Sequence, residues 1–210
     1  MTDHALQWLE AKLPGLFAQA VLDLERRASA GDETARQRLV DLDATAYALI
    51  RLSGEGQGDL HLESGRRALA IASGPIMAGS FGHALALPSA AARYGLAQLG
   101  DDGPELARLV SAWATLVSRD ARSVLAGMTY AFDLEVLRVP VIGDLRATIS
   151  LGSPDLPASV DFRLTLDYDE LEDAREQQLG PQQLFLAGKV RIDGDVAKAM
   201  MLGMTLAQLR

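Results

Sequence analysis

The feature that most constrains the fold is the segment between Val196 and Leu209, which is apolar at nearly every position. The residues that interrupt it are Lys198, Gly203, Thr205 and Gln208. A helix that is apolar on all sides has to be covered on more than one of them. Three of the six methionines of the chain lie in this segment, and the unbranched side chain of methionine adapts to neighbours of irregular shape. We therefore expect a helix that is either wedged between a sheet and other helices or forms one wall of an apolar binding site.

The residues that precede this helix alternate between apolar and polar positions, which is typical of strands with one buried face. Leu164 and Leu166, for example, alternate with Arg163 and Thr165. The expected strands of the second half are residues 132–139, 145–149, 160–166 and 186–192.

Turn and cap residues separate these strands from helices. Asp167 and Glu170 have the spacing of a capping box, which predicts a helix that begins at Tyr168 and ends near Gly180. A turn or a short helix is expected from Pro181. Gly194 and Asp195 are expected to turn the chain and cap the closing helix.

The first half of the chain begins and ends with helical patterns. Apolar residues recur at helical spacing over residues 6–24, with a kink or a break expected at Pro14 and Gly15. Asp32 is the expected N-cap of the next helix, and residues 45–87 are expected to form a hairpin or a meander. Further helices are expected over 89–100 and from Pro104 to 118. Periodicity lapses over 118–129, which is the best candidate for a boundary.

The two halves share one short sequence pattern. Gly-Asp-Leu occurs at Gly58 and again at Gly143, and each copy is followed by an apolar strand and then a helix. Internal repeats of this kind arise by duplication or by chance similarity of β-then-α units, and both interpretations stay open. The predicted fold is α+β, with helices on one face of a mixed, mostly antiparallel sheet. The predicted regions are residues 1–120, helical plus β and a candidate degenerate second copy, and residues 125–210.

Composition excludes several classes of function. A net charge of -8 with no basic run argues against nucleic acid or an anionic membrane as a partner. The chain has no cysteine, no recognisable signal peptide and no apolar run long enough to cross a bilayer, so we expect a cytoplasmic protein without membrane insertion. His4, His61 and His83 lack the spacing of metal ligands. We expect no metal, no cofactor and no catalytic residues.

The second half resembles the sterol carrier protein 2 (SCP2) family. In that family a strand leads to a helix with an acidic cap, then to a glycine and a proline, an aromatic-x-x-G-K-x-x-x-x-G-[ND] segment and a helix rich in alanine, methionine and leucine. Residues 160–202 follow this order, and the matching positions are Phe185, Gly188, Lys189, Gly194, Asp195, Ala199 and Met200.

The resemblance implies a five-stranded sheet with helices on one side and an apolar tunnel for a sterol, a fatty acid or a fatty acyl-CoA. It implies non-enzymatic binding or carriage of such a lipid-like small molecule. The alternative is a scaffold or dimerisation module that uses the same apolar helix, including a lipid-holding accessory role in quinone biosynthesis, with a homodimer or another protein as partner. The residues expected to contact a ligand are Phe162, Leu164, Leu171, Phe185, Val190, Ile192, Val196, Ala199, Met200, Leu202 and Met204.

Overall fold

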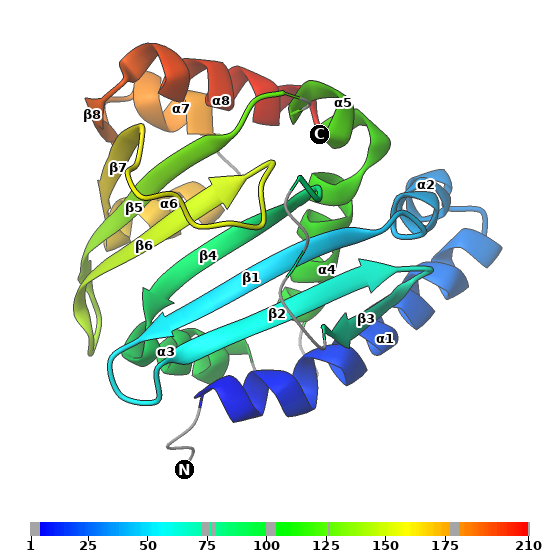
Figure 1. Cartoon of the computed structure of the whole chain (residues 1–210). Helices are drawn as coiled ribbons and strands as arrows, with labels where there is room; N and C mark the ends of the chain where they lie inside the picture. Colours follow the sequence, from blue (N-terminus) through cyan, green and yellow to red (C-terminus); the bar gives the residue numbers. More distant parts are fainter. Residues whose placement is uncertain are drawn as a thin grey trace.

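A single mixed β-sheet runs through both halves of the chain, and helices α3, α4 and α6 lie behind it in Figure 1. The computed structural model describes residues 5–72, 76, 79–99, 104–125, 127–176 and 181–209. The strands lie in the order β3-β2-β1-β4-β6-β5-β7-β8. Their bounds are Ala46–Ser53 (β1), Gly58–Gly65 (β2), Ala68–Ile71 (β3), Gly82–Pro88 (β4), Tyr130–Val139 (β5), Gly143–Leu151 (β6), Phe162–Asp167 (β7) and Arg191–Gly194 (β8).

The helices cover one face of this sheet. α1 and α3 pack on β1 and β2, α6 packs on β5 and β7, and α8 packs on β7 and β8. The α+β architecture with helices on one face is therefore as predicted. The helix bounds are Ala5–Ser29 (α1), Glu33–Asp41 (α2), Ser89–Leu99 (α3), Pro104–Val117 (α4), Arg119–Leu125 (α5), Tyr168–Glu176 (α6), Pro181–Leu186 (α7) and Val196–Gln208 (α8).

The sheet has eight strands, so the expected five-stranded sheet is wrong. β4 and β6 pair antiparallel, with His83 opposite Leu151, and this pairing joins the strands of the two halves. β1 with β4 and β5 with β7 are parallel, whereas the other neighbours are antiparallel, so the sheet is mixed and mostly antiparallel as predicted. The resemblance covers only the second half and gives no count of the strands that the first half adds.

The two halves of the sheet have the same internal order. β2-β1-β4 in the first half corresponds to β6-β5-β7 in the second: each is an antiparallel hairpin followed by a strand parallel to its first strand. A helix begins directly after the third strand in both, and the two Gly-Asp-Leu sequences begin β2 and β6. This agreement supports a duplication. Whether residues 1–120 and 125–210 are separate domains stays a prediction.

α1 continues through Pro14 as one helix, so of the two expected alternatives the break is wrong and the kink stays a prediction. The expected boundary region 118–129 contains α5, whose Ala121 and Leu125 are buried, and whether a domain boundary lies there stays a prediction. One segment differs from the sequence-based prediction. Leu186 ends α7 and does not begin a strand, because Gly188 has a φ of 70° and the Gly188 and Lys189 N–H groups donate back to α7 carbonyls. The predicted helix ends at Gly100 and Gly180 lie outside the described residues.

The predicted caps of α2 and α8 are confirmed. The Asp32 side chain accepts a hydrogen bond from the Ala35 N–H, and the Asp195 side chain accepts one from the Lys198 N–H. The turn before Asp195 requires glycine, because Gly194 has a φ of 104° and a Cβ there would lie 2.7 Å from the carbonyl oxygen of Asp161. The Asp195 N–H group donates to the same Asp161 carbonyl oxygen, which holds the start of α8 close to β7.

Candidate ligand-binding site

An apolar pocket of about 410 Å³ lies between α1, α4 and the helix-covered face of the sheet. We call it the apolar pocket. Its volume is in the lower part of the range of about 300–1,000 Å³ that is typical of small-molecule sites. The described residues that line it are Leu13, Leu16, Phe17, Ala48, Leu49, Ile50, Leu62, Leu69, His83, Ala84, Leu85, Val110, Ala112, Trp113, Leu116, Ile149 and Leu151.

The apolar pocket lies where separate core clusters meet. Phe17 and Val110 belong to a cluster that joins α1, α2 and α4. Ala48 and Leu62 belong to a second cluster, in which α1 and α3 pack on β1 and β2. Leu151 belongs to a third, which extends under α8. Because α1 and α4 each contribute an apolar stripe and β1 contributes the small side chain of Ala48, the space between the clusters is not filled.

His83 is the polar exception among the described lining residues. It is 6% exposed, and its ring lies edge-on to Phe81 and Trp113 at centroid distances of 5.3 and 5.6 Å. Its Nε2–H group lies 3.2 Å from the Leu116 carbonyl oxygen, and Nδ1 accepts from the Gly152 N–H at 3.4 Å. Burial lowers the pKa of His83 to about 4, so the ring is neutral near pH 7 and both nitrogens have partners.

The indole of Trp113 is also satisfied within the protein. Its Nε1–H group donates to the hydroxyl of Ser64 at 3.1 Å, and that hydroxyl donates to the Ala46 carbonyl oxygen at 3.3 Å. Neither His83 nor Trp113 therefore presents an unpaired hydrogen-bonding group to the apolar pocket. The described wall offers a ligand apolar contact only.

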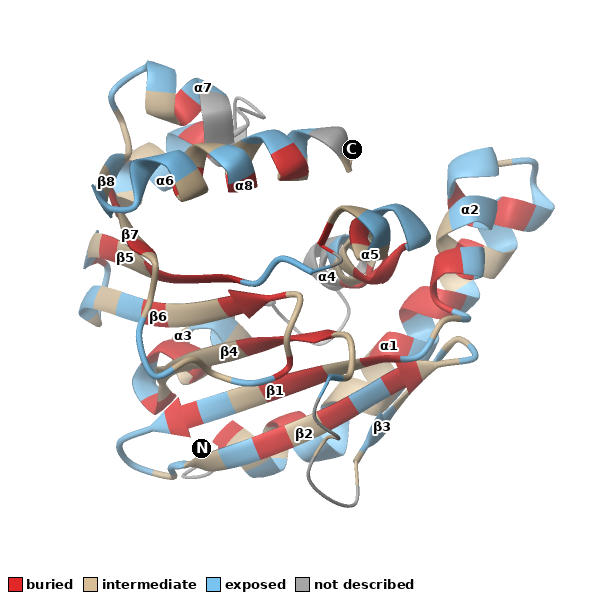
Figure 2. Ribbon diagram, turned by 45° about the horizontal axis from the view of Figure 1, so that its top comes forward, coloured by how far each residue is buried: buried red, intermediate tan, exposed pale blue. Residues whose placement is uncertain are grey.

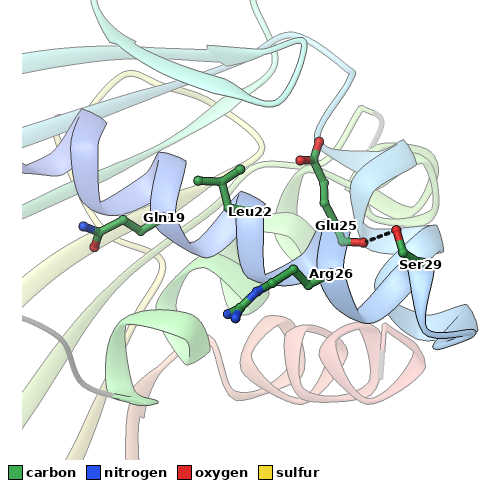
Figure 3. A pocket seen from close by; sticks show the side chains of 5 residues that line it. All are labelled: Gln19, Leu22, Glu25, Arg26 and Ser29. Carbon is green, nitrogen blue, oxygen red and sulfur yellow. Dashed lines mark hydrogen bonds between the residues drawn. The ribbon is translucent and has the colours of Figure 1, made fainter.

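Two larger hollows are poorer candidates. One of about 710 Å³ lies along α1, and its described lining residues all come from that helix: Gln19, Leu22, Glu25, Arg26 and Ser29 (Figure 3). Leu22 is 59% exposed, and the Ser29 hydroxyl donates a hydrogen bond to the Glu25 carbonyl oxygen of the same helix. The other, of about 850 Å³, is a polar cleft between α2, α4 and α5. Its buried Asp41 accepts hydrogen bonds from Gln37 and from the Arg119 backbone, which is a structural role.

The predicted site residues lie at several places in the described part of the second half. A core cluster beneath α8, built around Tyr130 and Phe132, contains Phe162, Leu164, Ile192, Ala199 and Leu202. Val190 packs in a neighbouring cluster, and Phe185 and Met200 are half-buried. Leu171, Val196 and Met204 are exposed. None of these residues is among the described residues that line the apolar pocket, so their contact with a ligand stays a prediction.

The closing helix packs on β7 and β8 and also contacts α7, but part of its surface stays exposed. Ala199, Leu202 and Thr205 are buried against the sheet, whereas Met201 and Met204 are 49% and 58% exposed. Figure 2 shows this mixture of buried and exposed positions along α8. α8 therefore lies against the sheet and α7, and Val196, Met201 and Met204 form an exposed apolar surface on it.

The second half carries the family signature. Residues 108–207 match the SCP-2 sterol transfer family. The match confirms the SCP2 resemblance and includes the greater part of α4 and all of β6, which supply Trp113, Leu116 and Ile149 to the apolar pocket. The walls from α1, β1, β2 and β4 lie outside the matched residues. No match was found among curated proteins.

Two further features bear on function. No helix in the described part of the chain is long and apolar enough to cross a membrane. Within the same residues, no group of three or more histidine, aspartate or glutamate side chains could hold a metal ion. The apolar pocket was not predicted from the sequence, because the residues that line it are far apart along the chain. The signal available for it was the pair of apolar helical stripes in α1 and α4.

Proposed function

We propose that the protein binds and carries a hydrophobic ligand, without catalysing a reaction, in the apolar pocket between α1, α4 and the sheet. The observation that carries the proposal is the pocket itself, with an apolar described wall and a His83 side chain whose ring nitrogens are both occupied. The match of residues 108–207 to a sterol transfer family supports the same class of ligand. A sterol or a fatty acyl chain in the cytoplasm is the ligand we would test first.

The expected affinity comes from apolar burial alone. Each methylene group removed from water contributes about 0.8 kcal/mol. Part of this gain offsets the loss of freedom on binding, which costs about 4 kcal/mol or more. A lipid tail of moderate length can therefore bind without a polar contact, and a carrier that must also release its ligand does not require more.

Direct recovery of a ligand tests the proposal. The purified protein is extracted with organic solvent, and the extract is analysed by mass spectrometry. Binding of a fluorescent sterol and a fluorescent fatty acid is then titrated. Failure to recover a lipid, together with failure to bind either probe, would refute carriage.

A filling substitution tests the location. Ala48 is buried at the pocket wall on β1, so Ala48→Phe should occupy the pocket and weaken binding at least about tenfold. Ala70→Phe is the matched control, because Ala70 is an exposed residue of β3 in the same sheet and does not line the pocket. Binding that survives Ala48→Phe but is lost in Met200→Glu would move the ligand to the predicted site beneath α8.

A second function is favoured by the outer side of α8. Val196, Met201 and Met204 are exposed there, and Leu186 at the end of α7 is 73% exposed. Methionine-rich surfaces suit partners of variable shape, so this surface supports the scaffold or dimerisation alternative. Sedimentation of the wild type and of the Met201→Glu, Met204→Glu double variant tests it. A monomer in both, with no change in ligand binding, would argue against this alternative.

A further inference from the structure

The hydrogen bonds around the apolar pocket point to the chemistry of its ligand. The polar side-chain atoms of the described wall are those of His83 and Trp113, and each has an intramolecular partner. His83 is held between the Leu116 carbonyl oxygen and the Gly152 N–H group, and Trp113 donates to Ser64. A ligand atom placed beside them would have to break one of these bonds to gain its own.

No charged side chain is among the described residues that line the pocket. A nearby cation is Arg122, whose guanidinium carbon lies 4.7 Å from the ring centroid of Phe81. That guanidinium donates to the carbonyl oxygens of Thr45 and Val117, so it is already engaged with the backbone. A carboxylate or phosphate inside the pocket would find no counter-charge in the described wall.

The costs of burial separate the ligand classes. A polar group buried without a hydrogen-bond partner costs about 1–3 kcal/mol, and an unpaired ionised group costs several kcal/mol. Hydrocarbon has no such penalty and gains from every methylene buried. The described wall of the pocket therefore favours uncharged lipids strongly over lipids with an ionised group.

We infer that the apolar pocket takes an uncharged lipid, such as an isoprenoid, a sterol ester or a fatty acyl ester, and discriminates against lipids with an ionised head group. This inference rests on the proposed function, because it assumes that the pocket is the ligand site. It narrows the ligand from hydrophobic molecules in general to lipids that carry no ionised group.

A matched pair of ligands tests the inference. A saturated fatty acid and its methyl ester are titrated, at neutral pH, against the full chain loaded with a neutral fluorescent hydrocarbon probe. The ester should displace the probe at a concentration at least about tenfold lower than the acid. Equal potency, or a more potent acid, would overturn the inference. Absence of probe binding and of displacement by either ligand would instead refute the proposed function.

A charge introduced at the wall provides the converse measurement. Leu69 lines the pocket from the edge strand β3 and is only partly buried, so the flexible side chain in Leu69→Lys can keep its ammonium near water. The variant should lower the preference for the ester at least about fivefold. The control Ala70→Lys adds the same charge at an exposed position of β3 that does not line the pocket, so it should keep the preference. An unchanged preference in a folded Leu69→Lys protein would contradict the inference. If that variant does not fold, the comparison of the acid and the ester on the wild-type protein still tests the inference.

Discussion

Acidification should destabilise the protein through His83. The unfolded chain titrates at the ordinary histidine pKa of 6.5, whereas burial lowers the pKa of folded His83 to about 4. Between these values the unfolded state binds more protons, so the free energy of unfolding falls as the pH is lowered. The stabilisation is complete above pH 6.5 and is lost progressively toward pH 4. From about pH 7.5 to about pH 5, the loss from this residue is about 2 kcal/mol.

Urea unfolding at the two pH values measures the effect. With a slope of about 2 kcal/mol per molar, the midpoint of the wild type should fall by roughly 1 M. His83→Gln removes the titration but keeps a donor and an acceptor, so its midpoint should fall much less over the same range. The lowered pKa values of Asp32, Asp59 and Asp161 affect stability below about pH 4, outside this window, and the raised pKa of Asp41 acts in the opposite direction. An equal fall in the wild type and in His83→Gln would refute the assignment.

Three further substitutions, two of them with a control variant, test the turn, the cap and the packing at α8, each by urea unfolding. Gly194→Ala should cost more than about 1 kcal/mol, because of its positive φ and its contact with Asp161, whereas Gly15→Ala, with open space around the added Cβ, should stabilise by about 0.5–1 kcal/mol. A change in the free energy of unfolding of the same sign in both variants would contradict the backbone geometry described for these two glycines. Asp195→Ala should cost about 1 kcal/mol by removing the N-cap of α8, and the exposed control Asp193→Ala less than about 0.5 kcal/mol. Phe132→Ala should cost about 3–5 kcal/mol by opening a cavity under α8, and wild-type stability would show that the space is not filled by this ring.

Features that a single short segment determines, such as helix caps, were predictable from the sequence. Asp32 and Asp195 were recognisable as N-caps because a capping side chain bonds to an N–H three residues later. The strand expected from Leu186 was wrong for a related reason. The alternation of apolar residues there crosses the end of α7, and the positive φ of Gly188 that ends the helix does not appear in an apolar-polar pattern.

The apolar pocket depends on distant residues and could not be predicted in the same way. Leu16, Ala48 and Leu116 belong to three elements that a sequence pattern assigns separately, each as an ordinary core residue. Whether such residues fill the space between them depends on how α1 and α4 are placed on the sheet. The sequence favoured a ligand site in the second half because the closing helix α8 is the more apolar. The apolar content of a helix shows how much of its surface has to be buried, but it does not show whether the packed core leaves a cavity.

The repeated order of the strands allows the wall of the apolar pocket to be compared with the filled core beneath α8. Phe132 of β5 pairs in register with Phe162 of β7, and their rings stack at a centroid distance of 5.2 Å beneath α8. When the halves are aligned at the start of the helix that follows the third strand, His83 of β4 corresponds to Phe162. Ala48 of β1, which pairs in register with His83, then corresponds to Phe132. The space that two phenylalanines fill in the second half is bordered in the first by an alanine and by a histidine turned toward the backbone of α4. The two halves can share one strand order and still differ in how well their cores are filled, since sheet pairing depends on the backbone and filling depends on side-chain volume.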